Sequence, residues 1–483
     1  DVTLDNVTVR DSFNGLRIGE PGVDYSGTPN GPTNVVVKDS TFENNDGYQF
    51  TDLTGEVSVT AVFESNGNSF TPSSVVDDQA ILSTESVPVV NVDQQTGYDS
   101  IQNAVDAAAP GDTIEVAAGS YDEQVVVSKD LTITAEDGAT LTRSTAPGSS
   151  FAENAFLLVN DSASVTVEGL RFQGPLPSPG TAGIFVTGGA SLTARDVTMQ
   201  QMFVDNGFGE PSGVQYHSAV VVGDKRYLDD PRNGTLLLED SEIDGFGKSA
   251  VTVAGSESSA VVRNVDVEGS GVLDPNTDGD NPAQDTFLVD GGSLTLTDSE
   301  VSNVKYDGSF VAGTGVSVYG PTPEVTVTDS TFEDVAKPIS LQAFRSFDTT
   351  PGTITDVSIT DNTISGHLLA VDLFSEGIDD STYVLNDSEI TDNQITDGTY
   401  GVGVAAGVTS GVTVTDNQFA SSGAQLFQST SALAPETFVA ENDLGRAVTT
   451  TANEYVYVSI QAAGDSASAG EKIVVTGGTY RAQ

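Results

Sequence analysis

The chain has 483 residues, and its apolar fraction of 37% suffices for a large core. Seventy Asp and Glu residues stand against 18 Lys and Arg, a formal net charge of -52, which excludes nucleic acid as a partner because phosphate binding needs clustered cations. An anionic membrane surface is disfavoured for the same reason, and no run of 18 apolar residues could span a bilayer. We therefore expect no nucleic-acid partner and no membrane insertion within this chain.

The acidic excess predicts a halophilic protein. At about 1 M salt the Debye length falls to about 3 Å, so self-repulsion becomes tolerable while the carboxylates keep the surface hydrated. A calcium-saturated acidic surface is the alternative, and the two can coexist. Cysteine is absent, so no disulfide framework contributes to stability.

One short phrase recurs from the first residues onward. Three alternating residues are followed by a pair rich in Asp and Asn and then by an apolar residue, which predicts a strand, a bend and an inward-pointing side chain. The phrase begins at Val2, Val35, Val165, Leu192, Leu236, Leu294, Val325, Val357, Tyr383 and Val412. Its spacing fits a coil that buries its apolar face only when neighbouring coils stack on it. The predicted fold is all-β, a right-handed parallel β-helix whose Asp and Asn positions form ladders.

A stretch that occurs twice marks where such a β-helix starts. Residues 97–124 and 456–483 align without a gap, and thirteen of their 28 positions are identical. In the first copy Ser100 is placed to cap a short amphipathic helix that ends at Pro110-Gly111. Its apolar positions are Ile101, Ala104, Val105 and Ala108, and it is followed by predicted strands at Thr113–Val116, Gln124–Val127 and Leu131–Thr134, with a turn at Gly119–Tyr121. We expect the helix to cover the open end of the strand stack.

These signals divide the chain into three parts. Residues 1–96 are predicted to be the terminal coils of a preceding unit, 97–454 a complete β-helix domain with its own cap, and 455–483 the cap of a following unit. We accordingly expect the 483 residues to be a portion of a longer product. The alternatives are a tandem-repeat polypeptide and a subunit that polymerises head to tail.

A calcium loop is the sharpest chemical signal. Residues 274–285 read DPNTDGDNPAQD, with the sharp-turn glycine at Gly279. The candidate ligands are Asp274, Asn276, Asp278, Asp280 and Asp285, whose spacing turns alternate oxygens toward one hard cation. A merely solvated acidic turn is the alternative, because an Asp-rich chain produces such strings by chance.

Other candidate sites are isolated. Asn-X-Ser/Thr sequons occur at Asn6, Asn160, Asn233 and Asn386 and predict a glycosylated, secreted surface protein. The two histidines, His217 and His367, stand alone and are expected to be ordinary surface or loop residues.

Two short segments resemble those of extracellular carbohydrate-active β-helix enzymes. Residues 119–123, GSYDE, match the Gly-X-Tyr-X-Glu phrase of pectin methylesterases, and Gln284-Asp285-Thr286-Phe287 is similar to their Gln-Asp-Thr-Leu segment. That resemblance implies an acyl-transfer site served by the Gln and Asp. The segment that should carry the nucleophilic Asp is replaced by Val304-Lys305-Tyr306-Asp307-Gly308, and Trp is absent from the chain. We therefore do not predict an enzyme.

The coil phrases and the acidic composition are together similar to those of haloarchaeal secreted β-helix repeat proteins. This resemblance implies an extracellular or cell-surface fibre, sheath component or adhesin. Our first reading is a structural or adhesive element forming a rigid acidic fibre, with copies of itself as partners and surface glycans as further candidates. The alternatives are a carbohydrate-binding adhesin domain and a polysaccharide lyase, hydrolase or esterase.

Overall fold

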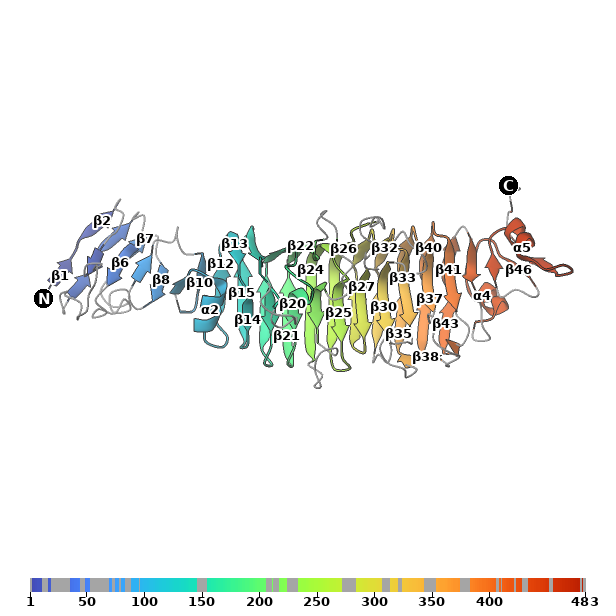
Figure 1. Cartoon of the computed structure of the whole chain (residues 1–483), viewed down its shortest axis with the longest axis horizontal. Coiled ribbons are helices and arrows are strands. Elements are labelled where there is room, and N and C mark those ends of the chain that lie inside the picture. The colour runs from blue at the N-terminus through green and yellow to red at the C-terminus, as the bar shows by residue number, and fades with distance from the viewer. Residues whose placement is uncertain are drawn as a thin grey trace.

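The chain forms a long rod of stacked coils, with the N-terminus at one end and the C-terminal segments at the other (Figure 1). It is seen in a computed structural model. The structure describes residues 2–10, 16–18, 35–43, 48–52, 69–71, 74–77, 80–82, 88–94, 96–145, 154–205, 211, 217–223, 233–271, 284–305, 313–319, 324–342, 353–373, 383–404, 408–409, 411–420, 423–427, 433–450, 455–477 and 480. The predicted all-β parallel β-helix is confirmed, because nearly every strand pairs in parallel with the strand one coil away.

Each coil of the central β-helix contributes three strands. The first strands are β12 Thr113–Val116, β15 Leu131–Ala135, β18 Ser164–Glu168, β21 Ala190–Arg195, β24 Gly234–Phe246, β26 Ser259–Glu268, β28 Ser293–Thr297, β31 Val325–Thr328, β35 Val357–Thr360, β39 Ser388–Thr391 and β43 Val412–Thr415. The second strands are β13 Gly119–Asp122, β16 Ala139–Thr142, β19 Arg171–Gln173, β22 Thr198–Met202, β29 Glu300–Ser302, β32 Thr331–Glu333, β36 Thr363–Ser365, β40 Gln394–Thr396 and β44 Gln418–Ala420, while β24 and β26 run through both positions. The third strands are β14 Val125–Val127, β17 Leu157–Val159, β20 Thr181–Val186, β23 His217–Val222, β25 Ser249–Ala254, β27 Asp285–Asp290, β30 Thr314–Tyr319, β33 Lys337–Gln342, β37 Leu369–Leu373, β41 Tyr400–Val404 and β45 Ala424–Phe427. We call the sheet of these third strands the third sheet.

Further coils precede the central β-helix. Their strands are β1 Val2–Asp5, β2 Thr8–Arg10, β3 Leu16–Ile18, β4 Val35–Lys38, β5 Thr41–Glu43, β6 Tyr48–Asp52, β7 Ser69–Thr71, β8 Ser74–Asp77 and β9 Ala80–Leu82. A small side sheet of β34 Thr353–Thr355, β38 Tyr383–Asn386 and β42 Val408–Thr409 accompanies the later coils.

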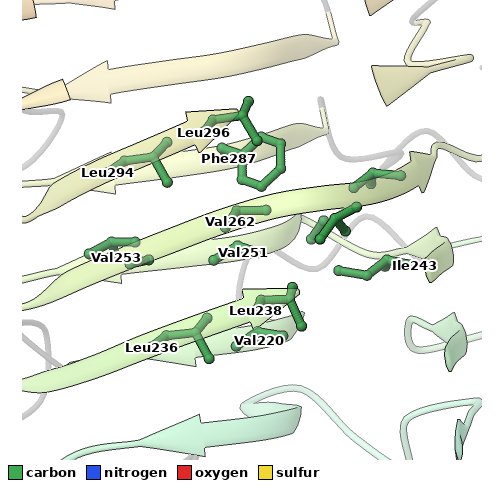
Figure 2. Packing of buried hydrophobic residues seen from close by; sticks show 14 of the residues in the cluster. Val220, Leu236, Leu238, Ile243, Val251, Val253, Val262, Phe287, Leu294 and Leu296 are labelled. Atoms are coloured by element: carbon green, nitrogen blue, oxygen red, sulfur yellow. The ribbon is translucent and has the colours of Figure 1, made fainter. Parts of the chain in front are cut away.

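The core is a continuous apolar column along the rod axis. Alternation along the first and second strands turns every other side chain inward, so Leu236 and Leu238 are buried. In Figure 2 these side chains of β24 lie in the interior together with Val220 of β23 and Val251 of β25. Because each coil covers the one before it, the burial is cooperative along the whole stack.

The Asp and Asn bend between the first and second strands is confirmed as a ladder. The first bend residue has a positive φ, as at Asp361 (58°) and Asp392 (57°), a conformation that Asp and Asn tolerate better than other side chains. The second bend residue points inward, and in the later coils it is a buried Asn. The Oδ1 atom of Asn393 accepts the Asn362 N–H at 3.0 Å, and its Nδ2 atom donates to the Ile359 carbonyl at 2.8 Å. The ladder continues through Asn417 to Asn442.

One recurrence of the phrase occupies a different place in its coil. In the phrase that begins at Tyr383, Ile390 pairs with Ile359 of a first strand, whereas Ile364 pairs with Ile395. The predicted strand at Tyr383 is instead β38 of the side sheet. Ile390 still follows a bend, at positive-φ Asp387, and is buried as the phrase predicts, but this bend joins the side sheet to a first strand.

In the described residues, the repeated stretch and the strand that precedes each copy form matching structures, which we call cap module 1 and cap module 2. Module 1 contains β10 Val89–Asn91, β11 Thr96–Tyr98, helix α2 Ile101–Ala107 and β12, and module 2 contains β46 Val448–Thr450, β47 Val456–Tyr457, helix α5 Ile460–Ser466 and β48 Ile473–Val475. The predicted cap is confirmed, because the Ser100 hydroxyl accepts the Asn103 N–H, and Ser459 does the same for Ala462. Tyr121 Oη lies 2.8 Å from the Ala117 carbonyl, and the counterpart Tyr480 Oη lies 3.1 Å from that of Thr476. A third helix, α4 Pro435–Glu441, precedes module 2.

The turn predicted at Gly119–Tyr121 was wrong. These residues belong to β13, which pairs in parallel with β16. The Tyr121 side chain is buried, and this burial raises the pKa of its phenol to about 12. Because the buried ring is held by hydrogen bonds to the Pro88 and Ala117 carbonyls, a segment whose local sequence favours a turn takes an extended strand conformation.

Candidate functional site

The predicted calcium ligands are only partly visible. Asp274, Asn276, Asp278 and Asp280 lie outside the described residues, so the calcium loop stays a prediction. Asp285 is described: it begins β27 and is 5% exposed. Its Oδ2 atom lies 2.8 Å from Lys248 Nζ, and its Oδ1 atom accepts the Thr314 hydroxyl. Within the described part of the chain, His, Asp and Glu side chains form no group of three suited to hold a metal.

A second buried ion pair lies farther along the third sheet. Lys337 Nζ of β33 is 2.7 Å from Asp372 Oδ2 of β37, and the carboxylate side chain is only 3% exposed. Lys248 immediately precedes β25, the strand beside β27, so both pairs link adjacent coils of the third sheet. A buried charge without a partner costs several kcal/mol, so each lysine is needed to keep its carboxylate in place. The arrangement fixes which coil stacks on which.

Three buried hydroxyl groups lie in the same sheet, on the strands β23 and β25. Ser249 Oγ lies 2.7 Å from Thr252 Oγ1 and 3.0 Å from Ser218 Oγ, and all three residues are buried. Gln284, the first residue of the esterase-like segment, is 1% exposed, and its Nε2 atom donates to the Phe246 carbonyl at 2.6 Å. The hydroxyl groups hydrogen-bond one another, and the Gln284 amide hydrogen-bonds the backbone. Gln284 of the segment that resembles pectin methylesterases thus has a structural role.

Both histidines were predicted to be surface or loop residues, and both are buried, although His367 does lie in the loop between β36 and β37. His217 is fully buried in β23, and its Nδ1 atom accepts the Val204 N–H at 3.0 Å. His367 is 3% exposed, and burial lowers the pKa of its imidazole from 6.5 to about 4. The ring packs on Gly398, where an added Cβ would lie 2.1 Å from Nε2.

The last coils and cap module 2 enclose a tyrosine-lined groove of about 510 Å³. Tyr400 comes from β41, Tyr455 precedes β47, and Tyr457 lies within β47. The rest of the wall is formed by Gly423, Ala424, Ala462 and Ser466. The rings of Tyr455 and Tyr457 are stacked with centroids 5.6 Å apart. A groove of this volume with aromatic walls and a few hydroxyls can hold one small ligand. No sequence motif pointed to it, because its residues come from three separate segments.

The four predicted glycosylation residues are described and lie in different settings. Asn6 is exposed, Asn160 and Asn386 are half-buried, and the Nδ2 atom of half-buried Asn233 donates to Glu257 at 3.0 Å. Their glycosylation stays a prediction. None of the helices in the described part of the chain is both long and apolar enough to cross a membrane.

Exposed aspartates run along the bend edge of the rod. Asp298, Asp329, Asp361, Asp392 and Asp416 all have a positive φ and expose their side chains. Because successive coils lie about 4.8 Å apart, these carboxylates form a row of closely spaced like charges. Such a row is destabilising at low ionic strength and is relieved by salt.

Comparisons with known proteins concern the fold. A search of curated protein sequences finds no match. A surface adhesin of Streptococcus pneumoniae aligns with 12% identity and a TM-score of 0.45, covering 74% of this chain and 94% of the adhesin. A tailspike protein of E. coli bacteriophage HK620 aligns with 12% identity and a TM-score of 0.41, covering 60% of this chain but only 50% of the tailspike. An alginate lyase of family PL6 has 12% identity and a TM-score of 0.37, with 86% of this chain and 58% of the lyase covered. Residues 249–444 match the family described as a right handed beta helix region, in agreement with the parallel stacking of β25 through β44, and the fold is a right-handed parallel β-helix.

Proposed function

We propose that this chain is an extracellular structural or adhesive element, a segment of a rigid acidic rod built from β-helix units in tandem or head to tail. The observation that carries the proposal is the recurrence of the cap module. Module 1 begins the central β-helix, and module 2 follows its last coil with the same hydrogen bonds. A device that starts a β-helix and is repeated where one stops supports growth by addition of units.

The charge distribution supports a habitat of high salt. The exposed aspartate row runs along the bend edge, while the buried carboxylates of Asp285 and Asp372 are each paired with a lysine. Calcium at Asp274, Asn276, Asp278 and Asp280, without Asp285, whose two oxygens are already paired, and glycans at the four sequons would be accessory features of such a surface protein. Each rests on sequence pattern alone.

Electron microscopy of the purified chain across a salt series tests the rod. We expect single rods at low concentration and longer end-to-end rods at several molar salt. Monodisperse particles at every salt and protein concentration would contradict assembly. Release of reducing ends or unsaturated products from acidic polysaccharides would point instead to an enzyme.

A second candidate function is saccharide binding, favoured by the tyrosine-lined groove. Aromatic rings provide flat apolar surfaces for the C–H faces of a sugar, and Tyr400, Tyr455 and Tyr457 line the groove. Ligand-observed NMR with neutral oligosaccharides tests it. We expect contacts that disappear in Tyr455→Ala but persist in Tyr319→Ala, a tyrosine on β30 outside the groove. Equal signals in both variants would contradict binding at the groove.

A further inference from the structure

Cap modules 1 and 2 differ in how much apolar surface they leave uncovered. Six large apolar side chains are exposed among the described residues, and three of them lie in module 2: Ile460 at 44%, Val474 at 38% and Val475 at 44%. In module 1 the counterparts of Ile460 and Val475 are Ile101 and Val116, and both are 0% exposed. The same residues in the same local structure are thus covered in one copy and open in the other.

Module 1 shows what kind of structure covers such a face. Strand β15 pairs in parallel with β12, with Ile133 beside Ile114 and Thr134 beside Glu115. The side-chain amide of Gln102 in α2 bonds the backbone of Val126 in β14, accepting its N–H at 2.6 Å and donating to its carbonyl at 3.3 Å. The same amide also donates to Asp106 of its own helix, and the counterpart Gln461 keeps that bond, to Asp465, but has no counterpart of β14 to bridge among the described residues. The natural occupant of this face is therefore the front of a β-helix coil.

The opposite end of the same rod presents such a front. In the first coil Leu4, Val7 and Val9 are half-buried, whereas Val37 and Phe42 one coil later are 1% exposed. Leu4 pairs in register with Val37, and Val9 pairs with Phe42. The two coils therefore differ in burial because the first coil is covered on one side only. Strands β1 and β2 thus expose the apolar side chains and backbone edge that β15 and β16 use in module 1.

We infer that β1, β2 and β3 of a second copy dock on cap module 2, with β1 pairing in parallel with β48. This inference rests on the proposed function and specifies its junction. The register follows from the bend: Val167, two residues before the positive-φ Gly169, lies beside Ile133, and Ile133 lies beside Ile114. Leu4 stands two residues before Asn6 (φ 55°), so it lies beside Ile473, the counterpart of Ile114. Asp5 then lies beside Val474.

The third strand of the incoming coil completes the junction. Strand β3 follows β2 as the third strands follow the second strands, and it carries half-buried Leu16. In the docked pair it lies over Ile460, and its backbone meets the Gln461 amide as Val126 meets Gln102. Parallel pairing, apolar cover and the amide bridge would then reproduce module 1 across two chains. Because each chain carries a formal net charge of -52, we expect docking of two copies to require salt.

A disulfide trap tests the register in a chain that has no native cysteine. Asp5→Cys and Val474→Cys place two outward side chains on neighbouring strands about 4.8 Å apart, within the range that a disulfide spans. Under mild oxidation at several molar salt, we expect a ladder of covalent dimers and higher species on a non-reducing gel. Adding a reductant should return these bands to the monomer. The matched control combines Asp5→Cys with Glu115→Cys. Glu115 is the exposed counterpart of Val474, but its neighbouring strand position is already taken by Thr134.

The outcomes separate the junction from the rod. A ladder in the first variant, at least tenfold stronger than in the control, supports the proposed register. Rods in electron microscopy without a selective ladder overturn the register and leave the rod intact, whereas absence of both overturns the rod as well. As a second measurement, Ile460→Asp is expected to abolish association without lowering the melting temperature, because the side chain is exposed in the single chain. Unchanged association in that variant would overturn the inference.

Discussion

Acidification should destabilise the rod through one buried imidazole, that of His367. Burial in the core lowers the pKa of this side chain to about 4, compared with 6.5 when it is exposed. Between these values the unfolded chain binds the proton more readily than the folded chain, so the free energy of unfolding falls as the pH drops from 6.5 toward 4. One pKa unit corresponds to about 1.4 kcal/mol, so the full loss is about 3 kcal/mol.

The measurement compares the wild type with His367→Leu by urea unfolding at fixed high salt between pH 7 and pH 4. Leucine fits the position, since Val335 occupies the same place one coil earlier and is fully buried. Subtracting the two curves is necessary because protonation of the many surface carboxylates relieves their repulsion and acts in the opposite direction. We expect the difference in unfolding free energy to shift by about 3 kcal/mol in favour of the variant. Parallel curves, or a His367 pKa near 6.5 by NMR, would refute the reasoning.

Three further changes probe the other elements. Asn393→Ala removes a buried ladder residue whose side chain accepts the Asn362 N–H and donates to the carbonyls of Ile359 and Thr391. In urea unfolding, the free energy of unfolding should fall by about 3–5 kcal/mol. A fall below about 1 kcal/mol would contradict the ladder's importance. Glu123→Ala removes the carboxylate that accepts the Ile101 and Gln102 N–H groups at the start of α2, and we expect a loss of about 1–2 kcal/mol by the same assay, with exposed Glu115→Ala as a control that changes stability little. Asp361→Asn keeps a residue that tolerates the positive φ but removes one charge from the aspartate row, so it should raise the melting temperature at low salt and have no effect at several molar salt; a salt-independent change would argue against repulsion in the row.

Glu123 illustrates how an enzyme-like phrase acquires a structural role. In sequence, GSYDE matches a carbohydrate-esterase phrase, yet Tyr121 anchors the strand β13 to two backbone carbonyls. The carboxylate of Glu123 caps the helix that seals the β-helix. In module 2 the corresponding residue is Ala482, which lies outside the described residues. The tyrosine contact to the backbone recurs there, so it belongs to the architecture of the module.

The β-helix itself could be predicted because its determinants are local. Period-two alternation, the Asp and Asn bend and the capped helix at Ser100 each depend on neighbouring residues, and all three were confirmed. The second cap module followed from identity with the first. These features repeat along the chain, so a pattern seen in one coil predicts the next.

Register between coils could not be predicted, because it depends on residues far apart in sequence. The sequence by itself determined the coil, its bend ladder, its acidic surface and its two caps. Only the tertiary structure decided that Lys248 faces Asp285, that three separate tyrosines share a groove, and that His367 lies against Gly398. Insertions of unequal length separate the coils, so spacing alone does not specify which side chains stack. The same stacking decides that Ile101 is covered while Ile460 is open, although both are the isoleucine that follows the serine N-cap in their copy of the repeated stretch.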